Sequence, residues 1–226
     1  MKRLVVISAG TGNPSSTRQL ADRLAQKSLD LLGEATVSVI ELGPLAADTA
    51  RAAVAGFPSE ELKQAIDRLA DADAIIAATP IYKAGMSGLF KTFVDVLDND
   101  LIVAKPVLLA ATGGTPRHAL VIDDQMRPLF AYMRALTLPT SVYAAPQDWA
   151  TTELGTRIQR AATELGVMVR AGVERLVADD AWSSYSHDFA GSAGRADRTA
   201  ADVDFDSPLM RLAAGGRAAP PQRDAA

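Results

Sequence analysis

The sequence predicts an α/β protein with a doubly wound parallel sheet, and two observations lead to this fold class. Five short apolar runs recur through the first two-thirds of the 226 residues, and amphipathic stretches separate them. Short, largely apolar runs are typical of strands that are buried on both faces of a sheet. Strands that alternate with helices in this way form a parallel sheet with helices on both faces.

The individual elements follow from the same patterns. The five predicted strands are Leu4–Ala9, Thr36–Leu42, Ala74–Thr79, Val107–Thr112 and Pro139–Tyr143. The first helix places Leu20, Leu24 and Leu31 on one face. The second begins at Ser59 and has two glutamates in its first turn, where the helix dipole favours them. The five predicted helices are Ser16–Leu32, Ser59–Ala70, Ser87–Leu97, about Ala119–Leu136, and Thr151–Ala178.

The domain organisation is predicted to be one domain over residues 1–180 followed by a tail over residues 181–226. From Ala190 the chain is rich in Ala, Gly, Arg and Asp, which is typical of a disordered segment. An apolar island between Val203 and Leu212 interrupts this segment. The island is either an isolated apolar stretch or an arm that docks on another subunit or a partner.

Composition excludes several classes of function. The 23 basic and 27 acidic side chains give a net charge of −4, which argues against a nucleic-acid partner. With no cysteine, the chain has no disulfide, thiolate metal site or cysteine nucleophile, and its two histidines, His118 and His187, are too few for a three-histidine metal site. No apolar run approaches the ~18 residues of a membrane span, so we expect a cytoplasmic protein without a membrane segment.

Ligands of doubly wound sheets bind beyond the carboxyl ends of the strands, which directs attention to the loop after the first strand. Its sequence, SAGTGNPSST, is rich in short hydroxyl side chains and leads into a helix. Such a cluster at a helix N-terminus suits a terminal phosphate monoester. One alternative is a dinucleotide loop, because Gly10, Gly12 and Ser15 nearly match G-x-G-x-x-G and Glu41 is available to hold a ribose. Another is that Ser15 or Ser16 only caps the helix.

The loops after the third and fourth strands supply the other walls of the predicted site. In the loop TPIYKAGMSGLFK, Tyr82 is placed to lie near a planar ring and Lys83 to add positive charge. In the loop ATGGTPRHA, Gly113 and Gly114 offer N–H groups that no side chain screens. Together the three loops predict a site with a phosphate at one end and a planar group at the other.

The segments TPIYKAGMSGLFKTFVDVLD and ATGGTPRHAL resemble the NAD(P)H-dependent FMN reductase family, and within it the alkanesulfonate-type enzymes. The resemblance covers about residues 1–178. It implies a flavodoxin-like fold with strand order 2-1-3-4-5 and hydride transfer from NADPH or NADH to flavin N5. It also implies a homodimer or homotetramer that supplies reduced flavin to a luciferase-like monooxygenase. Phe90, Phe93 and Val94 suit either a subunit interface or the core.

The resemblance also implies roles for single residues. The residues matching the phosphate loop are Ser8, Ser15, Ser16 and Thr17. Those matching the lining of the ribityl chain and the ring edge are Pro80, Ile81, Tyr82 and Lys83. Those matching the other side of the ring are Gly113, Gly114 and His118. No residue is predicted to act as an acid or a base, because the cofactor carries the hydride chemistry.

The sequence departs from the family at two places. The arginine that is common in the first loop is absent, which leaves Arg18 as a candidate substitute, and Asp123-Asp124 stands where some members have an inserted tyrosine. Two alternative functions stay open on the same fold. One is a quinone or azo reductase that holds FMN permanently, and the other is a flavodoxin-like electron carrier without pyridine-nucleotide activity.

Overall fold

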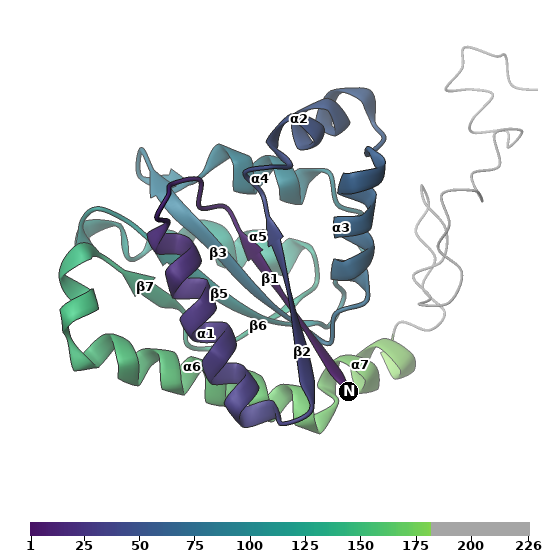
Figure 1. Cartoon of the computed structure of the whole chain (residues 1–226). Helices are drawn as coiled ribbons and strands as arrows, with labels where there is room; N and C mark the ends of the chain where they lie inside the picture. Colours follow the sequence, from purple (N-terminus) through teal and green to yellow (C-terminus); the bar gives the residue numbers. More distant parts are fainter. Residues whose placement is uncertain (182–226) are drawn as a thin grey trace, which may run out of the picture. The chain divides into compact units, whose positions relative to one another are not determined.

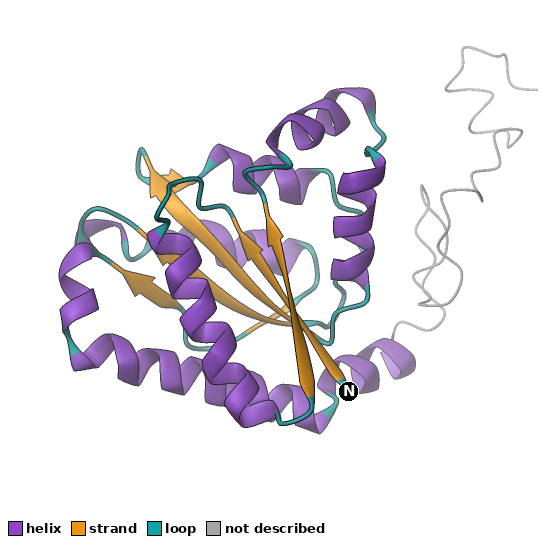
Figure 2. Ribbon diagram, viewed as in Figure 1, coloured by secondary structure: helices purple, strands orange, loops and turns teal. Residues whose placement is uncertain are grey.

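The computed structural model describes residues 1–181, which form a parallel sheet between two layers of helices (Figures 1 and 2). The strands are β1 (Lys2–Ser8), β2 (Ala35–Glu41), β3 (Ala74–Tyr82), β4 (Gly85–Met86), β5 (Pro106–Thr112), β6 (Leu136–Thr137) and β7 (Val142–Ala144). The sheet order is β2-β1-β3-β5-β6, with β7 also parallel to β5 and β4 antiparallel to β3. This arrangement confirms the predicted doubly wound, flavodoxin-like fold with order 2-1-3-4-5.

Alternate side chains of the strands face two separate apolar layers. Val5 and Ile7 of β1 pack with α2, α3, α4 and α5, whereas Leu4 and Val6 pack with α1 and α6. The helices are α1 (Ser16–Leu32), α2 (Ala46–Ala55), α3 (Glu60–Ala70), α4 (Gly88–Asp95), α5 (Arg127–Tyr132), α6 (Thr152–Ala171) and α7 (Val173–Ala181). Phe90 of α4 is fully buried in the first layer, so it belongs to the core of the subunit.

The structure differs from the predicted elements at several places, of which the following are the largest. Of the predicted fifth strand, Pro139–Tyr143, only the last two residues lie in a strand, because β7 begins at Val142. Strand β6 comes before the predicted range, and Pro139 between β6 and β7 has no N–H to donate to the ladder. Helix α2 is an alanine-rich segment without a clear apolar face, and the sequence patterns missed it. The helix predicted to end at Ala178 breaks at Gly172, whose φ of 65° ends α6. The tail and its apolar island lie outside the described residues.

A further difference is the helix predicted over Ala119–Leu136. A 3-10 turn over Pro116–His118, a π-helix over Ile122–Met126 and the short helix α5 replace it. Leu136 already belongs to β6. The side chains of Ile122 and Met126 are completely buried, which fixes the π-helix against the sheet.

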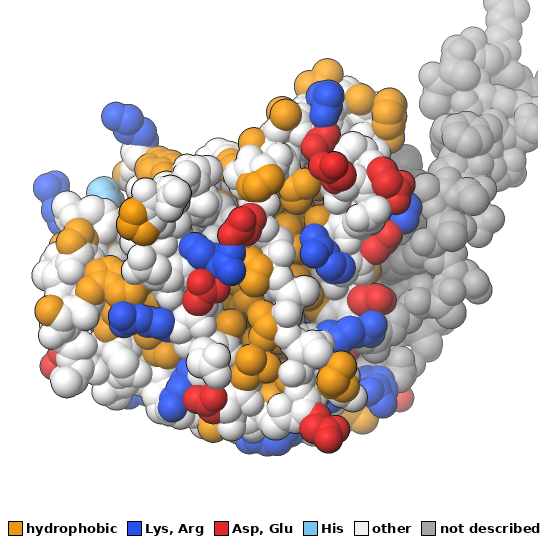
Figure 3. Space-filling view, in the orientation of Figure 1, with side chains coloured by type: hydrophobic (Ala, Val, Ile, Leu, Met, Phe, Trp, Pro, Cys, Tyr) orange, Lys and Arg blue, Asp and Glu red, His pale blue; other side chains and the backbone are white. Residues whose placement is uncertain are grey.

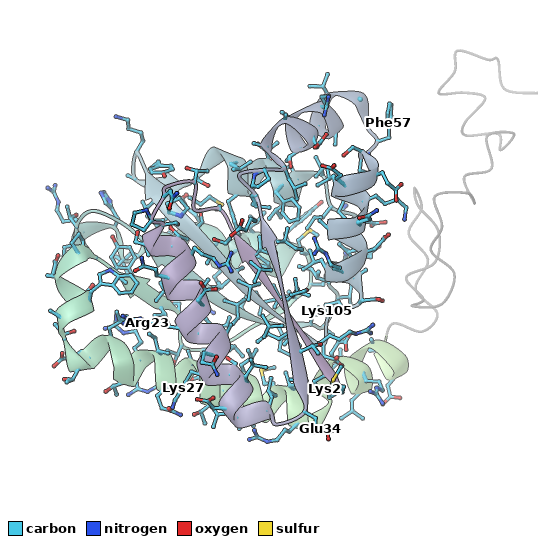
Figure 4. All side chains as sticks on the ribbon, in the orientation of Figure 1. Lys2, Arg23, Lys27, Glu34, Phe57 and Lys105 are labelled. Carbon is cyan, nitrogen blue, oxygen red and sulfur yellow. The ribbon has the colours of Figure 1, made fainter. Side chains whose placement is uncertain are left out.

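A buried ion pair attaches α7 to the amino end of the sheet. The Nζ atom of Lys105 donates to the carbonyl of Ala72 at 2.7 Å and to Oε1 of Glu174 at 3.0 Å. Lys105 directly precedes β5, and Figure 4 labels it beside the lower half of the strands, above Lys2. This contact therefore lies at the edge opposite to the carboxyl ends of the strands.

The outer surface carries charged side chains of both signs and a few exposed apolar ones. Acidic and basic side chains are interspersed on the face shown in Figure 3. Beyond the end of α2, Phe57 is 70% exposed and stands out from the ribbon (Figure 4). Within residues 1–181, no helix is both long and apolar enough to cross a bilayer.

Candidate functional site

The loops that follow β1, β3 and β5 meet at one edge of the sheet. Ser8, at the end of β1, is in register with Ala78 of β3, and Thr79 of β3 is in register with Ala111 of β5. Figure 1 shows the loop before α1 and the hairpin after β3 at the same end of the sheet. The fold therefore brings together the three loops that the sequence singled out.

The first loop folds tightly over the start of α1. Ser15 is the N-cap, and its Oγ accepts a hydrogen bond from the N–H of Arg18 at 3.1 Å. A Cβ atom at Gly10 would overlap Ser15 Oγ, so only glycine allows this close approach. Ser15 thus caps the helix, while its hydroxyl proton can still be donated to a ligand. Ser16 is exposed at the same helix end.

The other two hydroxyl residues of the predicted phosphate site lie deeper. Thr17 is buried, and its Oγ1 shares a hydrogen bond with Oγ1 of Thr112 at 2.7 Å, which links α1 to the end of β5. Ser8 is also buried, and its Oγ has no hydrogen-bond partner among the described residues. An unsatisfied buried hydroxyl costs about 1–3 kcal/mol, so Ser8 fits a site that a bound polar group completes.

Arg18 is the nearest cation in the sequence to this helix start. Its Nε donates to Oδ1 of Asp22 at 2.7 Å, and its Nη1 also contacts Glu41 at the end of β2. The hydrogen bond to Asp22 is the largest of the effects that raise the pKa of Arg18, with smaller charge effects from Asp22 and Glu41. Both acids therefore compete with any phosphate for Arg18, and Glu41 is engaged with Arg18 instead of standing ready for a ribose.

The second loop is a tight hairpin. Pro80 and Ile81 are buried at the end of β3, whereas Tyr82 is 56% exposed and Lys83 is exposed beside it. The chain turns back into β4 through Lys83 and Ala84, whose φ angles are 51° and 62°. Two residues with positive φ are typical of a two-residue hairpin turn, although Asn-Gly is the usual sequence. The turn presents Tyr82 and Lys83 at its tip and leaves Pro80 and Ile81 in its base.

Gln125 of the π-helix contacts this hairpin, and sequence reasoning missed it. Its Nε2 donates to the carbonyl of Ala84 at 3.3 Å, and its Oε1 accepts from the N–H of Met86 at 3.3 Å. The two partners are 41 and 39 residues away along the chain. No local pattern marks such a contact.

The third loop is held by Tyr143 of β7. The hydroxyl of Tyr143 donates to the carbonyl of Thr115 at 2.5 Å, and a Cβ atom at Gly113 would overlap that hydroxyl. The N–H of Gly113, which we expected to be open to a ligand, instead donates to the carbonyl of Ala144 at 3.2 Å. Gly114 is exposed, and half-buried His118 ends the 3-10 turn. Burial, and then the charge of Asp148, raise the pKa of Tyr143.

The sheet order and the gathering of these three loops at the carboxyl edge define the class as a flavodoxin-like α/β protein. The family model described as "NADPH-dependent FMN reductase" matches residues 2–150. The chain therefore belongs to the NADPH-dependent FMN reductase family, a family of oxidoreductases that use FMN with NADPH or NADH.

Individual relatives agree with this assignment. The chain is 39% identical to an FMN reductase (NADPH) of Pseudomonas aeruginosa over 150 residues, which cover 65% of this chain and 78% of the relative. It is 37% identical to the NADH-dependent FMN reductase SfnE of Pseudomonas putida, over 77% of this chain and 90% of the relative. A solved oxidoreductase from Corynebacterium diphtheriae superposes with a TM-score of 0.74 at 41% identity, over 76% of this chain and 98% of that structure.

Proposed function

We propose that this protein transfers a hydride from NADPH or NADH to N5 of FMN at the carboxyl edge of the sheet, and that it passes reduced flavin to a monooxygenase. The observation that supports this most directly is the meeting of a hydroxyl-rich helix start with the Tyr82 hairpin at one edge. The partner monooxygenase rests on the resemblance to alkanesulfonate-type reductases.

In this proposal the chain binds and orients its ligands. The hydroxyls of Ser15 and Ser16 and the free N–H groups of the first turn of α1 bind the phosphate, which the helix dipole also favours. Tyr82 and Lys83 border the ring on one side, and Gly114 lies on the other. FMN, when bound, supplies the ring that accepts the hydride. Correct stacking of the nicotinamide on the flavin ring would then depend on how firmly these loops are held.

The activity is tested by following NAD(P)H oxidation with and without added free FMN. Oxidation that depends on free FMN is expected, and no oxidation with FMN present would refute the proposal. Oxidation with a quinone and no added flavin would favour the alternative quinone or azo reductase.

The location of the phosphate is tested by the double variant Ser15→Ala, Ser16→Ala. Loss of hydrogen bonds to a charged group is expected to raise the Kd for FMN at least about tenfold. The matched control is Ser59→Ala, because Ser59 caps α3 in the same way, through the N–H of Leu62 at 3.3 Å. That control loses about 1 kcal/mol of stability and keeps its FMN affinity. An unchanged Kd in the double variant would remove the phosphate assignment.

The assembly and location of the protein also remain proposals. We propose a homodimer or homotetramer, which the exposed side chains of Val54 and Phe57 support. Sedimentation of the full chain tests this, and a monomer at all concentrations would contradict it. The cytoplasmic location stays a prediction from the sequence.

A further inference from the structure

We propose that Gln125 is a positioning residue that holds the β3–β4 hairpin in the conformation in which Tyr82 and Lys83 border the flavin. The inference rests on the proposed function in so far as the hairpin is taken to line the FMN site. The contacts of Gln125 with Ala84 and Met86, here called the clamp, are observed without reference to that function.

The hairpin needs to be held because its turn is strained. Lys83 and Ala84 both lie in the left-handed region, which costs a residue with a side chain roughly 1–2 kcal/mol. Neither is the Asn, Asp or Gly that such a turn favours. Strand β4 is only two residues long, so its pairing with β3 contributes little to holding the turn. Residues kept in such conformations persist only where surrounding structure fixes them.

The side-chain amide of Gln125 forms two hydrogen bonds with the hairpin backbone, as the backbone of a neighbouring strand would. It donates to the carbonyl of Ala84 and accepts from the N–H of Met86, so one side chain satisfies two backbone groups on either side of Gly85. A Cβ atom at Gly85 would lie 3.2 Å from Oε1 of Gln125. The missing side chain at Gly85 therefore leaves room for the amide to reach the backbone.

The element that carries Gln125 is itself firmly anchored. Its neighbours Ile122 and Met126 are completely buried, so the π-helix cannot rotate without disturbing the core. Arg127, which follows the π-helix, donates to Asp123 at 2.8 Å and to the carbonyl of Leu138 at 2.8 Å. Gln125 therefore connects a rigid element to a strained, exposed turn, which is the arrangement expected of a positioning residue.

The test compares Gln125→Ala with the control Asp124→Ala, which removes an exposed side chain from the same π-helix. Because the clamp selects the binding-competent hairpin, Gln125→Ala is expected to raise the Kd and KM for FMN about three- to tenfold and to lower kcat much less. Asp124→Ala is expected to leave all three unchanged. In the free protein, the N–H of Met86 should exchange with solvent faster in Gln125→Ala.

Rescue separates positioning from a direct contact with the ligand. Glycine adopts positive φ without a side-chain penalty, so Ala84→Gly in the Gln125→Ala background is expected to recover a large part of the lost affinity. An unchanged Kd in Gln125→Ala, or a raised Kd that Ala84→Gly does not lower, would overturn the inference.

Comparison with the serine variant separates this inference from the proposed function. If Ser15→Ala, Ser16→Ala raises the Kd while Gln125→Ala does not, the role of Gln125 is wrong and the flavin site is supported. If the serine variant has no effect while Gln125→Ala raises the Kd and Met86 exchanges faster, the phosphate assignment is wrong and the role of Gln125 is supported.

Discussion

Replacing Lys105 with Met is expected to lower the free energy of unfolding by about 3–5 kcal/mol, because it breaks a buried ion pair from one side. Lys105 is 3% exposed, and the side chain of Glu174 is 12% exposed. Met keeps most of the length of the side chain but removes the ammonium that faces Glu174 at 3.0 Å and the carbonyl of Ala72 at 2.7 Å. For a chain of this size the melting temperature should fall by about 10 °C.

The measurement is urea unfolding followed by circular dichroism, together with thermal melting. The control is Lys27→Met, because Lys27 forms a surface pair with Asp30 at 3.8 Å (Figure 4 labels both Lys27 and Lys105). Exposed pairs contribute little, so this control should change stability by less than about 1 kcal/mol.

A second variant separates loss of the charge from loss of packing. Adding Glu174→Leu to Lys105→Met removes both charges and should recover most of the stability, since apolar replacement of a whole buried pair is often neutral. A cost below about 1 kcal/mol for Lys105→Met, or a double variant less stable than the single one, would refute the reasoning. NAD(P)H oxidation at low temperature should be unaffected, because the pair lies at the edge of the sheet opposite to the proposed flavin site.

Three further predictions concern the site edge. Gly113→Ala should destabilise the protein by about 1–3 kcal/mol in thermal melts, because its Cβ would overlap the hydroxyl of Tyr143, whereas Gly114→Ala, with open space around it, should be nearly neutral. Thr17→Val should cost about 1–2 kcal/mol of unfolding free energy, because Oγ1 of Thr112 loses its buried partner; a neutral result in urea unfolding would contradict the contact. The raised pKa of Tyr143 means that the folded state binds its proton more tightly than the unfolded state. Its contribution to stability is therefore complete below the ordinary pKa of 10.0 and is lost as pH rises through the raised value; Tyr143→Phe should remove this part of the alkaline loss.

Several elements could be predicted because their signals are local. Helix α1 spans the predicted Ser16–Leu32, since an N-cap serine and an apolar face define a helix without reference to the rest of the chain. The same holds for α3 after Ser59. Where local signals were weak or conflicting, the prediction was wrong. The alanine-rich α2 has no strong periodicity, and the stretch after the third loop combines helical spacing with a π-helix that no apolar pattern reveals.

The sequence by itself determined the fold class, because strand and helix periodicity depend on neighbouring residues. Two of its loop segments were enough to indicate the family by resemblance, whereas the place of the flavin site stays a prediction. Only the tertiary structure decided how the loops are held. Thr17 forms a hydrogen bond with Thr112, and the N–H of Gly113 donates to the carbonyl of Ala144. Ser8 is buried, and its hydroxyl has no partner among the described residues. The tertiary structure also brought Gln125 to a hairpin 39 residues away. Such contacts form only when whole helices and strands pack together, so the spacing of residues along the chain does not indicate which of them will meet.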